Sequence, residues 1–143
     1  TMDEEKLIIR ENLAKDFPKT NSVLKTEDII RARNIVREVY MDEKIENYIL
    51  NIVFASRNPG KYGLPSFTNM ISYGASHRAS INLSLAAKAF AFTKRRGYVI
   101  PEDVRTICHD VMRHMIGLTY EAEAENINQD RIVSEILNIV EVP

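Results

Sequence analysis

A long segment that is apolar on nearly every side constrains the fold of this chain most strongly. Residues 78–95 carry two stripes of apolar side chains at helical spacing, one formed by Ala79, Leu83, Ala86, Ala87 and Phe90 and the other by Ile81, Leu85, Ala89 and Phe92. A surface helix needs only one such stripe, so a helix with two is expected to be enclosed by other helices. The chain is therefore predicted to be all-α, or nearly so, with this segment at its centre.

Other segments repeat apolar residues on a single face and complete a predicted bundle of about five helices. We expect these helices to begin near Thr26, Glu43, Pro101 and Gln129. The first of them has the stripe Ile29, Ala32, Val36 and Val39. Gly97 is predicted to end the central helix as its C′ residue. Residues 98–100 and 116–119 are predicted to pair as a minor two-stranded β ribbon.

Two regions lack a strong helical pattern. Residues 3–15 are predicted to be helical but have only a thin apolar face, and Pro18 interrupts the pattern. Residues 57–75 show no periodicity and contain the turn-forming run Asn58-Pro59-Gly60, so they are expected to form a loop. A loop of this length inside a compact domain is usually functional or mobile, and this one leads directly to the start of the central helix.

The start of the central helix, Gly74-Ala75-Ser76-His77-Arg78, is the candidate site. Ser76 is a suitable N-cap, and a helix N-terminus exposes unpaired N–H groups and positive potential. Arg78 opposes this dipole in the first turn, a mild misfit that points to an anion as its partner. The N–H groups and the guanidinium together suit a phosphate oxygen. The alternative is that Arg78 and His77 are ordinary solvated side chains.

Three segments, in order along the chain, resemble the MoxR branch of the AAA+ ATPases. Gly74–Ser80 resembles the sensor-2 motif of that family, with His77 where the family usually has proline. Arg95–Val104 and Asp110–His114 match two later motifs of the family. Met115 stands where the family usually has arginine, so a contact made by that arginine is not expected in this chain.

The resemblance implies an AAA+ lid domain made of residues 26–143, with residues 1–25 as a junction helix and linker toward an ATPase core. It implies that Arg78 is a catalytic residue that contacts the terminal phosphate of ATP bound in the core, and that Gly74, Ala75, Ser76 and His77 border the nucleotide. The lid would couple ATP hydrolysis to chaperone-like assembly or maturation of protein complexes. The implied partners are the chain's own core, neighbouring subunits of a ring such as a hexamer, and proteins with a von Willebrand factor A domain.

The parts of an ATPase that hold and cleave the nucleotide have no counterpart in this sequence. A phosphate loop requires the spacing G-x-x-x-x-G-K-[ST], but Gly60-Lys61 is followed by Tyr62. No apolar strand ending in paired acids is present to hold Mg²⁺. We therefore expect ATP and Mg²⁺ to be used by the full-length protein, with Mg²⁺ held by the core. The chain alone is expected to need no cofactor and to be no enzyme.

Composition and spacing disfavour several other classes of function. The 19 basic and 20 acidic residues give a net charge of −1, which disfavours a helical DNA-binding domain. The single Cys108 permits no internal disulfide and indicates a reducing compartment such as the cytoplasm. No segment is long and apolar enough to span a membrane. Cys108, His109 and His114 lack the i, i+3 or i, i+4 spacing of metal ligands on one helix face, so no metal site is expected.

A free-standing helical module that binds another polypeptide without nucleotide is the alternative function. It keeps the same bundle but gives Arg78 no phosphate partner. A phosphate-loop motif upstream in the same reading frame would favour the lid, whereas a start codon near Met2 would favour the module.

Overall fold

The computed structural model describes residues 1–14 and 21–143, so the predicted interruption at Pro18 lies outside the described residues. The described residues form two compact units, Thr1–Ala32 and Arg33–Pro143, with the boundary inside helix α2 (Thr26–Glu38). In the first unit, α1 (Met2–Leu13) begins with a capping box between Thr1 and Glu4, and all of its side chains are exposed. The predicted helix at the start of the chain is present, and the division between residues 25 and 26 stays a prediction.

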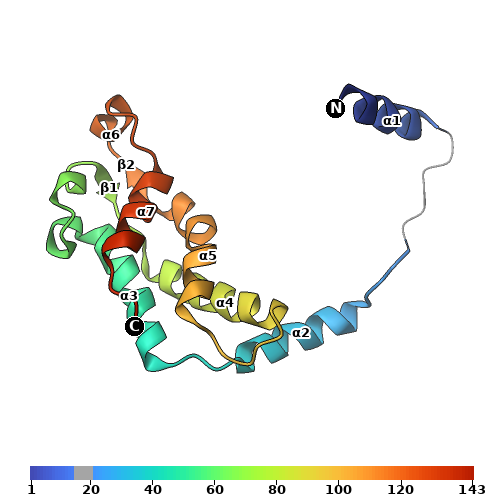
Figure 1. The fold of residues 1–143 in the computed structure, drawn as a ribbon, viewed down its shortest axis with the longest axis horizontal. Helices are drawn as coiled ribbons and strands as arrows, with labels where there is room; N and C mark the ends of the chain where they lie inside the picture. The colour runs from blue at the N-terminus through green and yellow to red at the C-terminus, as the bar shows by residue number, and fades with distance from the viewer. Residues whose placement is uncertain (15–20) are drawn as a thin grey trace. The chain divides into compact units, whose positions relative to one another are not determined.

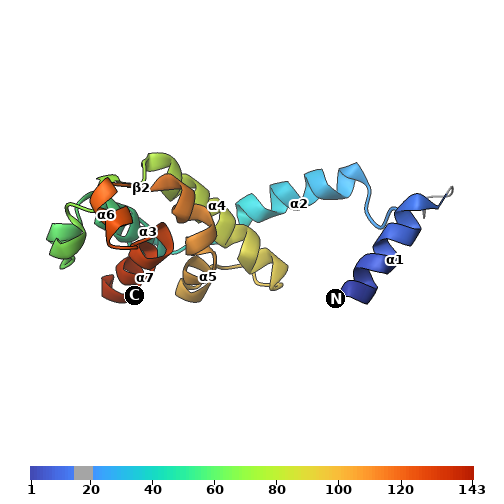
Figure 2. The ribbon, with the colours of Figure 1, turned by 90° about the horizontal axis from the view of Figure 1, so that it is seen from above.

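The second unit is a helical bundle with a small ribbon (Figure 1), which confirms the predicted fold class. Its elements after α2 are α3 (Glu43–Arg57), the 3-10 helices η1 (Pro59–Tyr62) and η2 (Pro65–Phe67), β1 (Ile71–Tyr73), α4 (His77–Thr93), α5 (Pro101–Met112), η3 (Arg113–Met115), β2 (Gly117–Leu118), α6 (Tyr120–Ala124) and α7 (Gln129–Ile139). α4 packs against α3 and α5, and α7 packs against the same two helices (Figures 1 and 2). These four long helices begin within about one residue of their predicted positions.

Side chains from the four long helices form one core. Its largest fully buried apolar members include Tyr48, Ile49, Ile52, Leu83, Met112, Ile132 and Ile136. Each buried leucine or isoleucine contributes roughly 1.5–3 kcal/mol by leaving water. The buried stripe of α4 consists of Ala79, Leu83, Ala87 and Ala91. Its three small alanines let α3 and α5 approach α4 closely.

Two predicted apolar stripes are less buried than expected. On α4, Ile81 and Leu85 are 55% and 46% exposed, so the expectation that this helix is enclosed on nearly every side is wrong. Of the predicted stripe Ile29, Ala32, Val36 and Val39, only Val39 is buried, and it lies one residue beyond the end of α2; Ile29 is exposed. Helical periodicity shows that a face can be covered, but Ile29, Ile81 and Leu85 stay exposed within the described residues.

The ribbon pairs different segments from those predicted. β2 is one of the expected strands, but its antiparallel partner is β1, with Ile71 opposite Leu118. Tyr98 instead forms a single parallel bridge with Tyr40. Residues 57–75, expected to be a loop, therefore contain η1, η2 and β1. Pairing between strands depends on neighbours that are distant in sequence, so local patterns specify it poorly.

α4 ends two residues earlier than predicted, in a Schellman motif around Arg95. The Arg96 amide donates to the Ala91 carbonyl oxygen at 3.0 Å. Arg95, with a φ of 58°, is the left-handed C′ residue, so the prediction that Gly97 has this place is wrong. The early turn lets Arg96 reach Asp103 in α5.

Arg95→Gly should stabilise the fold. A side chain in the left-handed conformation costs about 1 kcal/mol, which glycine avoids, and the Arg95 side chain is exposed. We expect the midpoint of urea unfolding to rise by the equivalent of about 1 kcal/mol. Arg95→Ala removes the same charge but keeps the Cβ, and it should leave the midpoint nearly unchanged. Equal gains in both variants would show that the charge, rather than the backbone conformation, is unfavourable.

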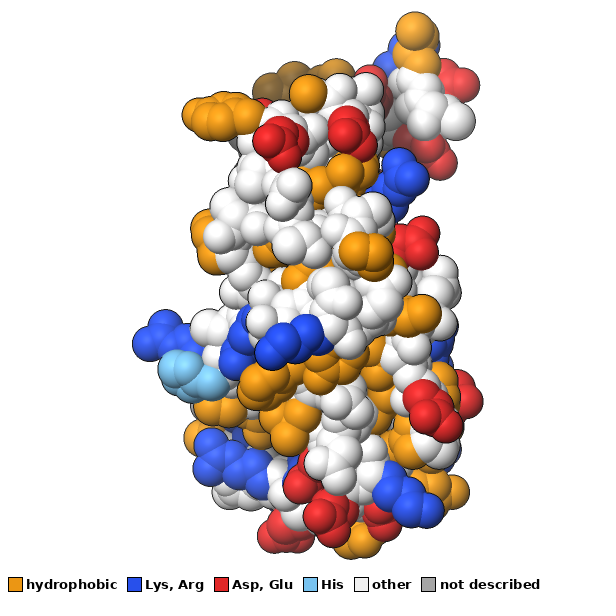
Figure 3. Space-filling model, turned by 90° about the vertical axis from the view of Figure 1, so that its left-hand side faces the viewer, with side chains coloured by type: hydrophobic (Ala, Val, Ile, Leu, Met, Phe, Trp, Pro, Cys, Tyr) orange, Lys and Arg blue, Asp and Glu red, His pale blue; other side chains and the backbone are white. Residues whose placement is uncertain are grey.

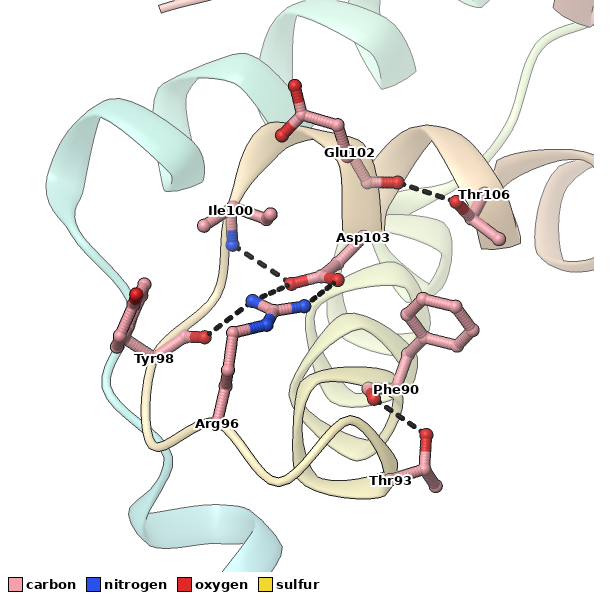
Figure 4. A network of polar contacts seen from close by, with 8 residues as sticks. All are labelled: Phe90, Thr93, Arg96, Tyr98, Ile100, Glu102, Asp103 and Thr106. Atoms are coloured by element: carbon pink, nitrogen blue, oxygen red, sulfur yellow. Dashed lines mark hydrogen bonds and ion pairs between the residues drawn. The ribbon is translucent and has the colours of Figure 1, made fainter.

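A polar network joins the end of α4 to the start of α5 (Figure 4). The Arg96 guanidinium forms a two-pronged ion pair with Asp103, in which Arg96 Nη1 lies 2.8 Å from Asp103 Oδ2. The same carboxylate oxygen accepts from the Ile100 amide at 3.0 Å, and Arg96 also donates to the Tyr98 carbonyl oxygen. Hydrogen bonding to Asp103 raises the pKa of Arg96, so the guanidinium stays charged. The Asp103 side chain is only 2% exposed, and these partners satisfy its buried charge.

Candidate functional site at the start of α4

The start of α4 places Ser76, His77 and Arg78 at the surface. Ser76 is the N-cap, with a φ of −76° and a ψ of 175°, and its Oγ accepts from the Arg78 amide at 3.3 Å. His77 is the first helical residue and Arg78 is the second. Within the described residues, neither of these two side chains makes a hydrogen bond or an ion pair. The Arg78 guanidinium is therefore available to an anion.

Gly74 and Ala75 hold the start of α4 against α3. The Ala75 amide donates to Ser56 Oγ at 3.0 Å, and the Ala75 carbonyl oxygen accepts from Arg57 Nε at 2.6 Å. A Cβ on Gly74 would lie 2.5 Å from the Ser56 carbonyl oxygen, so only glycine permits this approach of the two backbones. Of the five candidate residues, Ala75 is fully buried and Gly74 is partly buried.

Ser56 and Arg57, at the end of α3, support the site but were not predicted from the sequence. The Arg57 guanidinium carbon lies 4.8 Å from the centre of the Phe54 ring, a cation–π contact, while its Nε binds Ala75. Arg57 and Ala75 are 18 residues apart in the chain. The one signal in the sequence is that Arg57 is the first residue of the segment 57–75, which lacks periodicity. This position does not indicate that Arg57 binds Ala75.

His77→Pro should stabilise the chain by about 0.4–1 kcal/mol. Proline suits the first helical position because its preset φ is helical and the N–H there has no helical partner. The His77 amide makes no hydrogen bond within the described residues, and the extended Ser76 backbone suits a residue before proline. Urea unfolding would measure the gain, with His77→Ala as the control for loss of the imidazole. A midpoint of urea unfolding below that of His77→Ala would show that proline distorts the start of α4.

Cys108, His109 and His114 have separate surroundings. Cys108 is buried in α5, and burial raises the pKa of its thiol to about 12, so the thiol is uncharged at neutral pH. His109 Nε2 lies 3.0 Å from Ser134 Oγ of α7, and His114 is exposed in η3. Among the described residues, no group of three or more His, Cys, Asp or Glu is placed to hold a metal ion. In the same part of the chain, no helix has the length and apolar character needed to cross a membrane.

Comparisons with known proteins identify the family. The family described as AAA lid domain matches residues 67–136, which include β1, α4 and α5. The chain is 33% identical to chaperone MoxR1 of Mycobacterium tuberculosis over 126 residues, which are 88% of this chain and 33% of that protein. It is 34% identical to protein MoxR of Paracoccus denitrificans over 87 residues, which are 57% of this chain and 26% of that protein. The chain belongs to the MoxR-type AAA lid domains.

The lid domain also matches a solved structure. A crystal structure of a proposed ATPase from Cytophaga hutchinsonii superposes on it with a TM-score of 0.91 and 38% identity, covering 100% of this chain and 44% of that one. The lid domain spans about a third of the length of the curated relatives that it matches. The predicted family is therefore confirmed, while the roles assigned to residues 74–78 stay predictions.

Proposed function

We propose that the lid domain closes over ATP bound in a separate core of the full-length protein, and that Arg78 contacts the terminal phosphate. The observation that supports this most is the exposed Arg78 guanidinium beside the capped N-terminus of α4. A cation there opposes the helix dipole, and a bound phosphate removes that misfit. During phosphoryl transfer the guanidinium would stabilise charge on the phosphate oxygens, and the lid would loosen after hydrolysis.

The face of α4 that carries Arg78 supports docking of the lid domain onto a core. Ile81 and Leu85 follow Arg78 at i+3 and i+7, so they share its face. Both are exposed, and with Leu50 of α3 they line a groove of about 470 Å³. Exposed apolar surface of this kind marks interaction sites. The phosphate contact and an apolar contact with the core would thus lie on the same side of α4.

Binding and cleavage of the nucleotide are assigned to the core. Mg²⁺, when bound there, neutralises charge on the phosphates. The residues of the lid domain would border the nucleotide, and Arg78 would supply one positioned charge. The full-length protein is therefore proposed to be an ATPase, whereas this chain alone is not.

The cellular role follows from the family and from the name of one relative, which is a chaperone. We place the full-length protein in a ring of subunits such as a hexamer, where ATP hydrolysis drives assembly or maturation of protein complexes. Proteins with a von Willebrand factor A domain are the proposed partners. The single buried Cys108 favours a reducing compartment such as the cytoplasm.

ATP turnover by the full-length protein tests this function. Arg78→Ala should slow hydrolysis without changing stability. The alternative, a module that binds a polypeptide and ignores nucleotides, rests on the same exposed groove of Leu50, Ile81 and Leu85, which a polypeptide partner would fill in place of the core. It predicts that Arg78→Ala leaves turnover unchanged, while Leu85→Asp weakens binding of a polypeptide partner.

A further inference from the structure

We propose a second anion site that does not use Arg78, although it shares Arg57 and Gly74 with the surroundings of the start of α4. It takes the phosphate group of a small phosphorylated molecule. The site is a groove of about 320 Å³ between the end of α3 and β1. The polar residues in its walls are Arg57, Asn58, Lys61, Thr68 and Ser72, and Ile71 and Tyr73 add an apolar part.

The walls of this groove contain cations and neutral donors but no carboxylate. Four other clefts in the part of the chain that the structure describes each include a glutamate, namely Glu46, Glu38, Glu123 and Glu121. Figure 3 looks onto the face that carries η1 and η2; basic side chains lie over its middle, and both basic and acidic side chains lie toward the bottom. The charge of the groove therefore selects an anion.

Arg57 is held in place before any ligand binds. Its Nε donates to the Ala75 carbonyl oxygen, and its guanidinium lies against the Phe54 ring. Within the described residues, its two Nη atoms and the Lys61 Nζ atom make no hydrogen bond or ion pair. Charged donors of these two kinds form the strongest hydrogen bonds to phosphate, and a fixed donor loses less entropy when a ligand binds.

The number and variety of donors favour phosphate over carboxylate. A phosphate monoester presents three oxygens, and the groove supplies a guanidinium, an ammonium, an amide and the hydroxyls of Thr68 and Ser72. A carboxylate presents only two oxygens, which one arginine satisfies. The groove is also larger than a phosphate ion. The ring of Tyr73, 65% exposed, provides a surface for the organic part of the molecule.

NMR titration of the chain tests this site. The probes are inorganic phosphate, phenyl phosphate and benzoate at constant ionic strength. We expect both phosphates to shift the amide signals of Lys61, Ser72 and Gly74 to saturation, phenyl phosphate to bind more tightly, and benzoate to have no such effect. Lys61→Gln should weaken phosphate binding about tenfold, because it removes a charge-assisted hydrogen bond. Lys44→Gln, an exposed lysine at the opposite end of α3, should leave the affinity unchanged.

A third variant separates this site from the proposed function. Arg78→Ala should bind phosphate with unchanged affinity. Loss of phosphate binding in Arg78→Ala would place the anion at the start of α4, which overturns the second site and leaves the proposed function intact. Equal weakening in Lys61→Gln and Lys44→Gln, shifts that grow without saturation, or equal binding of benzoate would also overturn the second site.

Discussion

Arg78→Ala should lower ATP turnover by the full-length protein about 10–1000-fold, or about 1.4–4 kcal/mol, the range for losing one positioned donor that stabilises charge in the transition state. Arg78→Lys should restore little of it, because an ammonium lacks the planar fork of the guanidinium. The melting temperature should stay the same, since the exposed Arg78 side chain makes no polar contact within the described residues. Steady-state ATPase assays and thermal melts of the same variants check both expectations.

Arg131→Ala is the matched control for this experiment. Arg131 is an exposed arginine near the start of α7, and its loss should leave both turnover and melting temperature unchanged. Wild-type turnover in Arg78→Ala would contradict the sensor role. Loss of turnover together with a large drop in melting temperature would instead make Arg78 a structural residue.

Asp103→Ala should destabilise the lid domain by about 3 kcal/mol. The substitution leaves Arg96 without its buried partner and removes the acceptor for the Ile100 amide at the start of α5. Urea unfolding followed by circular dichroism measures the loss, and the melting temperature should fall by roughly 10 °C. Both ends of the connection between α4 and α5 depend on this one carboxylate (Figure 4).

Asp110→Ala tests whether burial is what makes Asp103 important. Asp110 forms an ion pair with Arg113, three residues further along the chain, in which Asp110 Oδ1 lies 3.3 Å from Arg113 Nη2. Unlike Asp103, the Asp110 side chain is exposed. Such a pair contributes less than about 1 kcal/mol. A similar loss of stability in the two variants would mean that the network around Asp103 adds no more than a surface ion pair.

The helices of the second unit could be predicted because each has a strong local signal. Ile45, Ile49 and Ile52 repeat at helical spacing and are buried in α3. Ser76 has the right chemistry for an N-cap, and Pro101 has the preset backbone of a first helical residue. In each case the residues that determine the element lie within a few positions of one another, so one window of sequence contains the information.

The rest of the site depends on contacts between distant segments. Ser56 and Arg57 reach Ala75 from another helix, and nothing near them in the sequence indicates this. The predicted end of α4 is wrong for the same reason: Arg95 is the left-handed residue, and the adjacent Arg96 pairs with Asp103, which belongs to another helix. A stripe such as that of Ile81 and Leu85 indicates a face suited to burial without indicating what covers it.

The tight approach of Gly74 to α3 has a mechanical consequence. The backbone of Gly74 lies against that of Ser56. The two hydrogen bonds of Ala75, to Ser56 and Arg57, also hold the start of α4 to the end of α3. A ligand that pulls on Arg78 therefore cannot stretch the segment in front of it, and the force passes into α3. Because α3 packs in turn against α7, the four helices should turn together as a lever. A small displacement of Arg78 toward a phosphate would then produce a larger displacement at the far ends of the helices.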